Sequence, residues 1–114
     1  MHISERTVGD VVIVEVSGKV TLGDGGDVVL KDKMQSLVQQ GRKKVLLNLA
    51  DVSYVDSAGL GEIVQSYATV MKNGGALKLL NVTKRLKDLL SITKLLTVFE
   101  TYENEGDAIK SFSG

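Results

Sequence analysis

The chain has 114 residues, of which 43% are hydrophobic, and its 14 basic and 14 acidic side chains give a formal net charge of zero. Length and composition favour one globular domain over residues 1–114, and the balanced charge gives no indication of a nucleic acid or an anionic membrane as partner. The absence of cysteine excludes disulfides and thiolate chemistry, and an aromatic content of 4% leaves little material for base-stacking surfaces.

The N-terminal third predicts a β-hairpin followed by a helix. The first residues are too few and too polar for a signal peptide, and no apolar run approaches a membrane span, so we expect a cytoplasmic protein. Strands are expected over 3–8 and 11–16, joined by a tight turn at Gly9-Asp10. A glycine-rich loop over 23–27 supplies carboxylates that can cap a helix over 28–40, whose apolar residues recur at helical spacing.

The rest of the chain alternates strands and helices. The almost continuous apolar run over 45–49 predicts a central strand buried on both faces. A helix is expected from Ser57 to about Lys72, followed by a strand over 76–80. Two shorter helices follow, capped by Thr83 and by Asn104, with a last short strand near 97–99 between them. The order β-β-α-β-α-β-α-β-α predicts an α/β fold, a mixed β-sheet with about four α-helices.

The stretch Val-Asp-Ser-Ala-Gly-Leu-Gly places Ser57 where the central strand gives way to a helix. The residues alone leave its role open between nucleophile, phosphate-binding residue, helix cap and modified residue. As a cap, Ser57 or the neighbouring Asp56 would accept a hydrogen bond from the first turn. Ala58, Gly61 and Gln65 fall on the helix face opposite the apolar stripe, where small residues permit close approach. The pattern therefore predicts a docking surface with a hydroxyl at its rim.

Motifs of catalysis and ligand binding do not fit this chain. The single histidine, His2, lies near a terminus expected to fray, which argues against a Ser–His–Asp triad. The serine is not in a G-x-S-x-G motif, no P-loop occurs, and the run beginning at Gly59 matches two of the three glycines of a dinucleotide fingerprint. Asp24 and Asp27 lie in a loop that lacks the EF-hand pattern. We expect no enzymatic activity, no metal and no cofactor.

A phosphate on Ser57 is expected to block this surface. Free N–H groups and the macrodipole at a helix N-terminus favour an anion, so the fold should persist. Asp56 and Glu62 lie close in sequence, and no lysine or arginine occurs from position 51 to 71, so the phosphate would have no basic partner within this segment. A basic residue remote in sequence, such as Arg85, would change that expectation.

Five stretches, spread over nearly the whole chain, resemble one known family. They are Gly18-Lys19-Val20, the strand over 45–52, the segment over 55–61, the turn and strand over 73–79, and Val98-Phe99. The family is that of the STAS domain anti-sigma factor antagonists, and the segment around Ser57 is the most specific part. The resemblance implies a four-helix, mixed-sheet fold and a phosphoprotein that regulates transcription, with stress response as the expected setting.

In that family, the unmodified antagonist binds an anti-sigma factor that is itself a serine kinase, and the sigma factor is released. The kinase phosphorylates the serine that matches Ser57, the complex breaks, and a PP2C-type phosphatase reverses the change. The loop after the second strand helps to bind the kinase, and here Thr21 occupies a position where family members often carry Asp. The resemblance and the residues together predict these partner-binding residues: Asp56, Ser57, Ala58, Gly59, Gly61, Glu62, Gln65, Thr21 and Asp24.

A second function of a different kind stays open. The chain would then be a non-switching STAS interaction module, such as a stressosome-like scaffold subunit or an accessory domain of a transporter. The residues favour the antagonist, because we expect a solitary domain with a modifiable serine. Its expected partners are an anti-sigma factor serine kinase and a phosphatase, with no nucleic acid and no membrane, in a monomer or weak dimer. Ser53, Ser66 and Thr83 are lesser candidates for modification.

Overall fold

The fold was obtained as a computed structural model that describes residues 1–21 and 26–113. Four helices and a mixed sheet follow in the expected order, so the predicted fold class is confirmed. The elements in the described residues are β1 (His2–Val8), β2 (Val11–Val20), α1 (Gly26–Gln39), β3 (Lys44–Val55), α2 (Ser57–Lys72), β4 (Ala76–Leu80), α3 (Lys84–Ile92), β5 (Thr101–Tyr102) and α4 (Glu105–Ser111).

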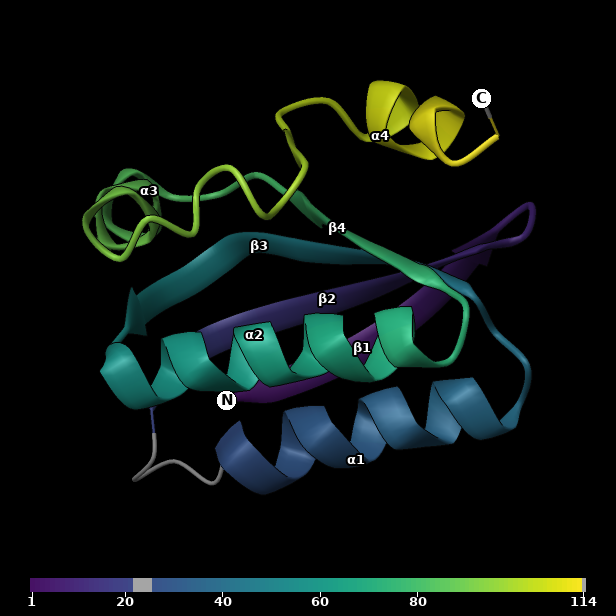
Figure 1. Ribbon diagram of the computed structural model, residues 1–114, viewed down its shortest axis with the longest axis horizontal. Coiled ribbons are helices and arrows are strands. Elements are labelled where there is room, and N and C mark those ends of the chain that lie inside the picture. Colours follow the sequence, from purple (N-terminus) through teal and green to yellow (C-terminus); the bar gives the residue numbers. More distant parts are fainter. Residues whose placement is uncertain (22–25, 114) are drawn as a thin grey trace.

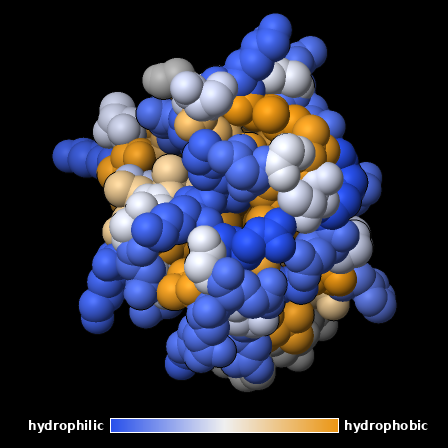
Figure 2. Space-filling model, turned by 90° about the vertical axis from the view of Figure 1, so that its right-hand side faces the viewer, coloured by the Kyte–Doolittle hydropathy of each residue, from blue (hydrophilic) through white to orange (hydrophobic). Residues whose placement is uncertain are grey.

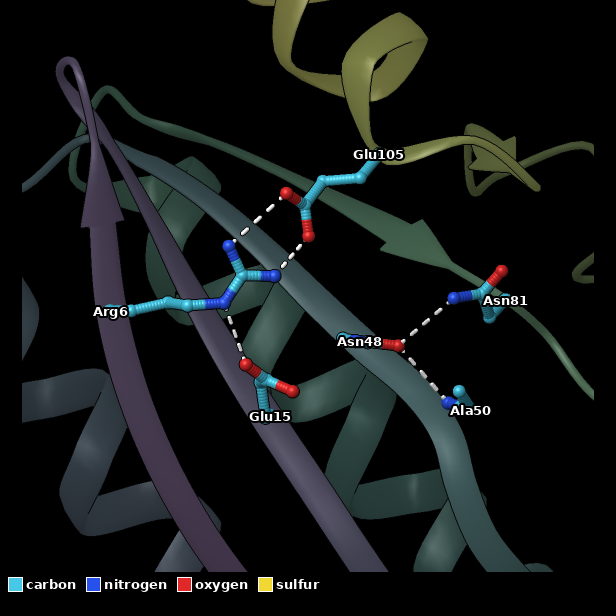
Figure 3. A network of polar contacts seen from close by, with 6 residues as sticks. All are labelled: Arg6, Glu15, Asn48, Ala50, Asn81 and Glu105. Atoms are coloured by element: carbon cyan, nitrogen blue, oxygen red, sulfur yellow. Dashed lines mark hydrogen bonds and ion pairs between the residues drawn. The ribbon is translucent and has the colours of Figure 1, made fainter.

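The sheet has the strand order β1-β2-β3-β4-β5, with β1 antiparallel to β2 and the other pairs parallel. Strand β3 pairs with β2 over nearly its whole length, but with β4 only from Lys44 to Asn48. At the point where β3 leaves β4, the Asn48 side-chain oxygen accepts hydrogen bonds from Ala50 N at 3.1 Å and from Asn81 Nδ2 at 3.3 Å (Figure 3). These bonds accompany a shift in the β2–β3 register and allow β3 to continue beyond its neighbour.

The larger core lies between one face of the sheet and helices α1, α2 and α3. Alternate residues of β2 face this core because successive side chains of a strand point to opposite faces. Helices α1 and α2 lie side by side over that face, and α4 lies on the other side of the sheet (Figure 1). The helix side chains buried in this core are Leu30, Met34, Leu37, Leu60, Ile63, Val70, Leu86 and Leu90.

The second core is small and lies under α4. Val11, Ile13, Leu46 and Leu80 from three strands pack with Ala108 of α4. Because α4 has only seven residues, its apolar contribution is limited, and polar contacts add to its attachment.

Two groups of polar contacts tie α4 to the sheet. Arg6 of β1 donates through Nε to Glu15 of β2 at 2.7 Å and through Nη1 to Glu105 of α4 at 3.1 Å, with a further ion pair from Nη2 to Glu105 (Figure 3). The hydrogen bonds from Arg6 hold the pKa of Glu105 below its ordinary value of 4.5. At the other end of α4, Lys78 Nζ donates to the carbonyl oxygen of Ser111 at 3.1 Å.

The predicted last strand was wrong in position. Residues 97–99 form turns, in which Val98 N donates to Leu95 O at 3.0 Å, and the strand that pairs with β4 is Thr101–Tyr102. Phe99 is buried in an edge-to-face contact with Tyr67 of α2, their ring centres 5.0 Å apart. The apolar character of this stretch therefore reflects packing against a helix, not strand pairing. The second strand and the central strand also run further than expected, to Val20 and Val55.

Figure 2 shows the end of the molecule opposite the start of α2, where hydrophilic side chains dominate and apolar atoms form separate areas. The turn between β1 and β2 lies at this end, and Lys44 pairs there with Asp10 at 2.6 Å. Among residues 1–21 and 26–113, no helix combines the length and the apolar character needed to cross a membrane.

Candidate functional site

The candidate site lies at the end of the sheet where the parallel strands finish. Strands β2 and β3 end there, and α2 and α3 begin there, as the left side of Figure 1 shows. In α/β proteins this edge is where ligands and partners commonly bind, because helix N-termini and loops converge on it.

Helix α2 begins directly after β3, and its cap is Asp56. The Asp56 backbone is extended, and its Oδ1 accepts a hydrogen bond from Gly59 N at 2.7 Å. Of the two cap candidates, the structure therefore selects Asp56. Ser57 is the first helical residue and is exposed. Its hydroxyl is thus not committed to capping, which leaves it accessible to a kinase or a partner.

Gly59 lies on the inner side of the first turn of α2. A Cβ built at this position would lie 1.8 Å from the carbonyl oxygen of Val20 and 2.7 Å from its carbonyl carbon. Such distances do not occur between real atoms, so only glycine permits this approach of α2 to the end of β2. Gly59 is buried, and its contribution to the site is to fix where the first turn lies.

The outward side of the start of α2 is exposed and carries mostly small side chains. Ser57, Ala58, Gly61 and Gln65 are exposed, and Glu62 is half-buried. A Cβ at Gly61 would meet no atom within 4 Å, so this glycine is not required by internal packing. The structure thus brings together on one face the small residues that the sequence predicted there.

The loop after β2 is described only at its start. Thr21 is half-buried and follows Val20, whose carbonyl touches the first turn of α2, so Thr21 lies beside the candidate surface. Asp24 lies outside the described residues, as do most of the residues of the loop in which it was expected to act.

Basic side chains reach this end of the molecule from other elements. The guanidinium carbon of Arg85 in α3 lies 5.6 Å from the centre of the Tyr54 ring, three residues before Ser57. Lys19 of β2 is the register partner of Tyr54. The segment from 51 to 71 has no lysine or arginine, but the fold supplies both at its edge. Sequence reasoning named Arg85 but had no means of placing it.

The lesser candidates for modification differ in exposure. Ser66 is 2% exposed, and its hydroxyl donates to Glu62 O at 2.8 Å, which makes it a poor kinase target. Thr83 caps α3 by accepting from Leu86 N at 3.3 Å. Ser53 is exposed on β3. Ser57 and Ser53 therefore remain as accessible hydroxyls in this set.

The described residues hold no obvious metal centre, since no three His, Cys, Asp or Glu side chains among them lie close enough to share an ion. Within 1–21 and 26–113, the site offers an accessible hydroxyl, a helix N-terminus and an exposed face with small side chains. That combination suits protein recognition and group transfer onto the protein by another enzyme.

Residues 2–108 match the STAS domain family, and the chain belongs to that family. Several curated relatives are named as anti-sigma factor antagonists, which agrees with the sequence resemblance. The anti-sigma-B factor antagonist of Bacillus subtilis is 43% identical over 72 residues, which cover 63% of this chain and 65% of the relative. That alignment spans slightly less than two thirds of the relative.

Two solved structures share the fold. A candidate anti-sigma factor antagonist from Thermotoga maritima superposes with a TM-score of 0.89 and 24% identity, over 98% of this chain and 95% of the other. The Bacillus cell fate determinant SpoIIAA, in its phosphorylated form, gives a TM-score of 0.74 and 18% identity, over 96% of this chain and 98% of the other. At these identities the likeness concerns the fold.

Proposed function

We propose that this chain is an anti-sigma factor antagonist that acts by partner switching. The unphosphorylated form binds an anti-sigma factor that is also a serine kinase, and the sigma factor is released. The kinase then phosphorylates Ser57, the complex breaks, and a PP2C-type phosphatase restores the binding form. The single observation that carries the proposal is the exposed Ser57, which Asp56 frees from capping and which lies beside the exposed small residues Ala58 and Gly61.

The electrostatics of the first turn support release without unfolding. A phosphate brings about −1.5 to −2 charges, and the free N–H groups at the start of α2 favour an anion there. The neighbouring Asp56 carboxylate already accepts a hydrogen bond from one of the N–H groups of this turn, that of Gly59. At about 6 Å and an effective dielectric of about 20, two like charges repel by roughly 3 kcal/mol, and less where solvent reaches them. The modified face therefore stays folded and becomes strongly anionic.

The small side chains at the start of α2 explain why one phosphate would suffice to block the partner. Ala58 and Gly61 offer almost no side chain, so a partner must approach the backbone of α2 closely. A phosphate on Ser57 occupies that space and adds a charge that the contact would have to desolvate. The names of the relatives point in the same direction, since the Bacillus subtilis relative is an antagonist of an anti-sigma factor and SpoIIAA has been solved in a phosphorylated form.

The first test is intact-mass analysis of the protein from its native cells, with peptide mapping of residues 45–72. The proposal expects one added phosphate, located on Ser57 and absent from Ser53. If no phosphate is found on Ser57 across growth and stress conditions, the switch is rejected and the non-switching module becomes the better account.

The second test is binding to the purified anti-sigma factors of the source organism. Ser57→Asp should weaken binding by roughly tenfold or more, and Ser57→Ala should bind like the wild type but accept no phosphate. Ser113→Asp is the matched control, because it adds the same charge at an exposed position after α4, away from the start of α2. Equal weakening by both Asp variants would contradict a specific role for Ser57.

A further inference from the structure

Tyr54 and Arg85 form an exposed pair next to the Ser57 surface. The Tyr54 side chain is 39% exposed at the end of β3, and the guanidinium carbon of Arg85 lies 5.6 Å from the centre of its ring. This distance falls within the range of a cation–π contact. Only Val55 and Asp56 separate Tyr54 from Ser57 in the chain, so the pair lies at the same end of β3 as the candidate surface.

The first turn of α3 carries charges that its own helix disfavours. Lys84 and Arg85 occupy this turn, which contains no acidic residue, although a helix N-terminus favours anions and disfavours cations. By contrast, Lys72 and Lys110 lie in the last turns of α2 and α4, where the macrodipole favours them. Two basic residues at a position where they destabilise the helix indicate that Lys84 and Arg85 serve a purpose other than stability.

The cations at this end form no ion pair with any of the described residues. Within the described part of the chain, neither Lys84 nor Arg85 forms an ion pair, whereas Lys87, one turn further along α3, pairs with Glu103 at 3.3 Å. Lys19, the register partner of Tyr54, is exposed as well and forms no ion pair among the described residues. Lys84 and Arg85 thus begin α3, and Lys19 lies on the strand next to Tyr54, so three positive charges lie at this end of the sheet.

We infer that Tyr54 and Arg85, flanked by Lys19 and Lys84, form a second docking area that receives an acidic segment of the anti-sigma factor that binds at Ser57. This inference rests on the proposed function and deepens it. The complete surface would carry charges of both signs. Around α2 it presents Asp56, and around the start of α3 it presents cations. A partner complementary to it must therefore carry carboxylates opposite α3, and the two areas together fix its orientation.

The composition of the pair suits such a contact. Tyrosine and arginine are enriched among the residues that dominate binding energy at interfaces, because each buries a large area and keeps a polar group for hydrogen bonding. A guanidinium held against a ring is also oriented before binding, which favours a two-point contact with a carboxylate.

The test measures the dissociation constant of the purified anti-sigma factor for four variants and the wild type, at low and at moderate salt. Arg85→Glu and Tyr54→Ala should each weaken binding by roughly tenfold or more, and the salt dependence of Arg85→Glu should be smaller than that of the wild type. Lys110→Glu is the control, since it makes the same charge change on an exposed residue of α4 and should stay within about twofold.

Thermal unfolding separates lost binding from lost folding. Lys84→Glu places a carboxylate where the dipole of α3 favours it, without touching the Tyr54 ring. It should therefore leave the unfolding midpoint unchanged or raise it, while binding weakens. If all of these variants bind within about twofold of the wild type while Ser57→Asp releases the partner, the second docking area is rejected and the proposed function stands. If the wild type binds none of the source organism's anti-sigma factors, the proposed function fails and this inference with it.

Discussion

Gly59 of α2 and Val20 of β2 approach so closely that a Cβ atom on Gly59 would lie 1.8 Å from the Val20 carbonyl oxygen. Backbone meets backbone at this contact, so no flexible side chain can move aside. The position of the first turn of α2, and with it the Ser57 hydroxyl, is therefore set against the end of β2.

Gly59→Ala should destabilise the fold by more than about 2 kcal/mol, because the added methyl group forces the strand end and the helix apart. Gly61→Ala, two residues along the same turn, should be neutral or stabilising by up to about 0.5 kcal/mol, since its Cβ meets open space and alanine favours helix. Urea unfolding of both variants measures the contrast. Similar stabilities for the two would show that the first turn is not held against β2.

Gly61→Ala should nevertheless weaken binding of the anti-sigma factor, because it adds a methyl group to the exposed face. Gln35→Ala, at an exposed position of α1 outside the candidate surface, is the control and should leave binding unchanged. The measurement is a calorimetric titration of each variant. A gain in stability together with a loss of binding would separate the functional glycine from the structural one, and unchanged binding would count against close approach at Gly61.

Asp56→Ala should lower the free energy of unfolding by about 1 kcal/mol, since it removes the side-chain acceptor for Gly59 N. Ser57→Ala should change it by less than about 0.5 kcal/mol, because that hydroxyl is not the cap. Asp56→Asn keeps an acceptor oxygen and should fall between them. If Ser57→Ala proves the more damaging, the assignment of the cap is wrong.

Stability should fall in acid partly through the contact of Arg6 with Glu105. The hydrogen bonds from Arg6 place the pKa of folded Glu105 below its ordinary value of 4.5, so the carboxylate contributes fully above about pH 4.5. This contribution is lost as the pH falls through the lowered folded pKa. Glu105→Gln should therefore destabilise the protein by roughly 0.5–1 kcal/mol at neutral pH and leave a shallower acid dependence. Glu103→Gln, whose side chain is 86% exposed, is the matched control, and equal pH profiles for the two would refute the assignment.

Phe99→Ala should lower stability by about 3 kcal/mol or more, because the buried ring packs edge-on against Tyr67. Ile92→Ala truncates an apolar side chain that is 78% exposed and should change stability by less than about 0.5 kcal/mol. Thermal unfolding of the two variants tests the packing of Phe99 against α2. A mild effect of Phe99→Ala would mean that this segment is not anchored to α2.

The order of elements was predictable because apolar periodicity differs between strands and helices, as the run over 45–49 and the stripe of α2 show. The residues at which strands begin and end were less predictable from the sequence. Strand β3 continues to Val55 because Asn48 bonds to Ala50 N and so stabilises a register shift, which no local pattern indicates. The strand expected near Phe99 fails for a related reason, since burial against a helix and burial in a sheet give the same apolar signal.

The part of the candidate surface that lies on a single helix could be predicted from the sequence. Helical spacing alone placed Ala58, Gly61 and Gln65 on one face. It could not decide whether Asp56 or Ser57 caps, because both residue types accept from the first turn. Nor could it bring Arg85 to Tyr54, which lies 31 positions earlier and on another element, since that contact exists only once the sheet and α3 are assembled.

The attachment of α4 has a consequence for synthesis on the ribosome. Arg6 emerges among the first residues, but Glu105 is 99 positions later, so the pair cannot form until α4 has been made. Until then Val11, Ile13, Leu46 and Leu80 on that face of the sheet have no covering helix. Nascent chains with uncovered apolar faces are prone to aggregate. The nascent domain therefore needs protection longest on the face opposite α1 and α2, and the appearance of residues 105–112 ends that need.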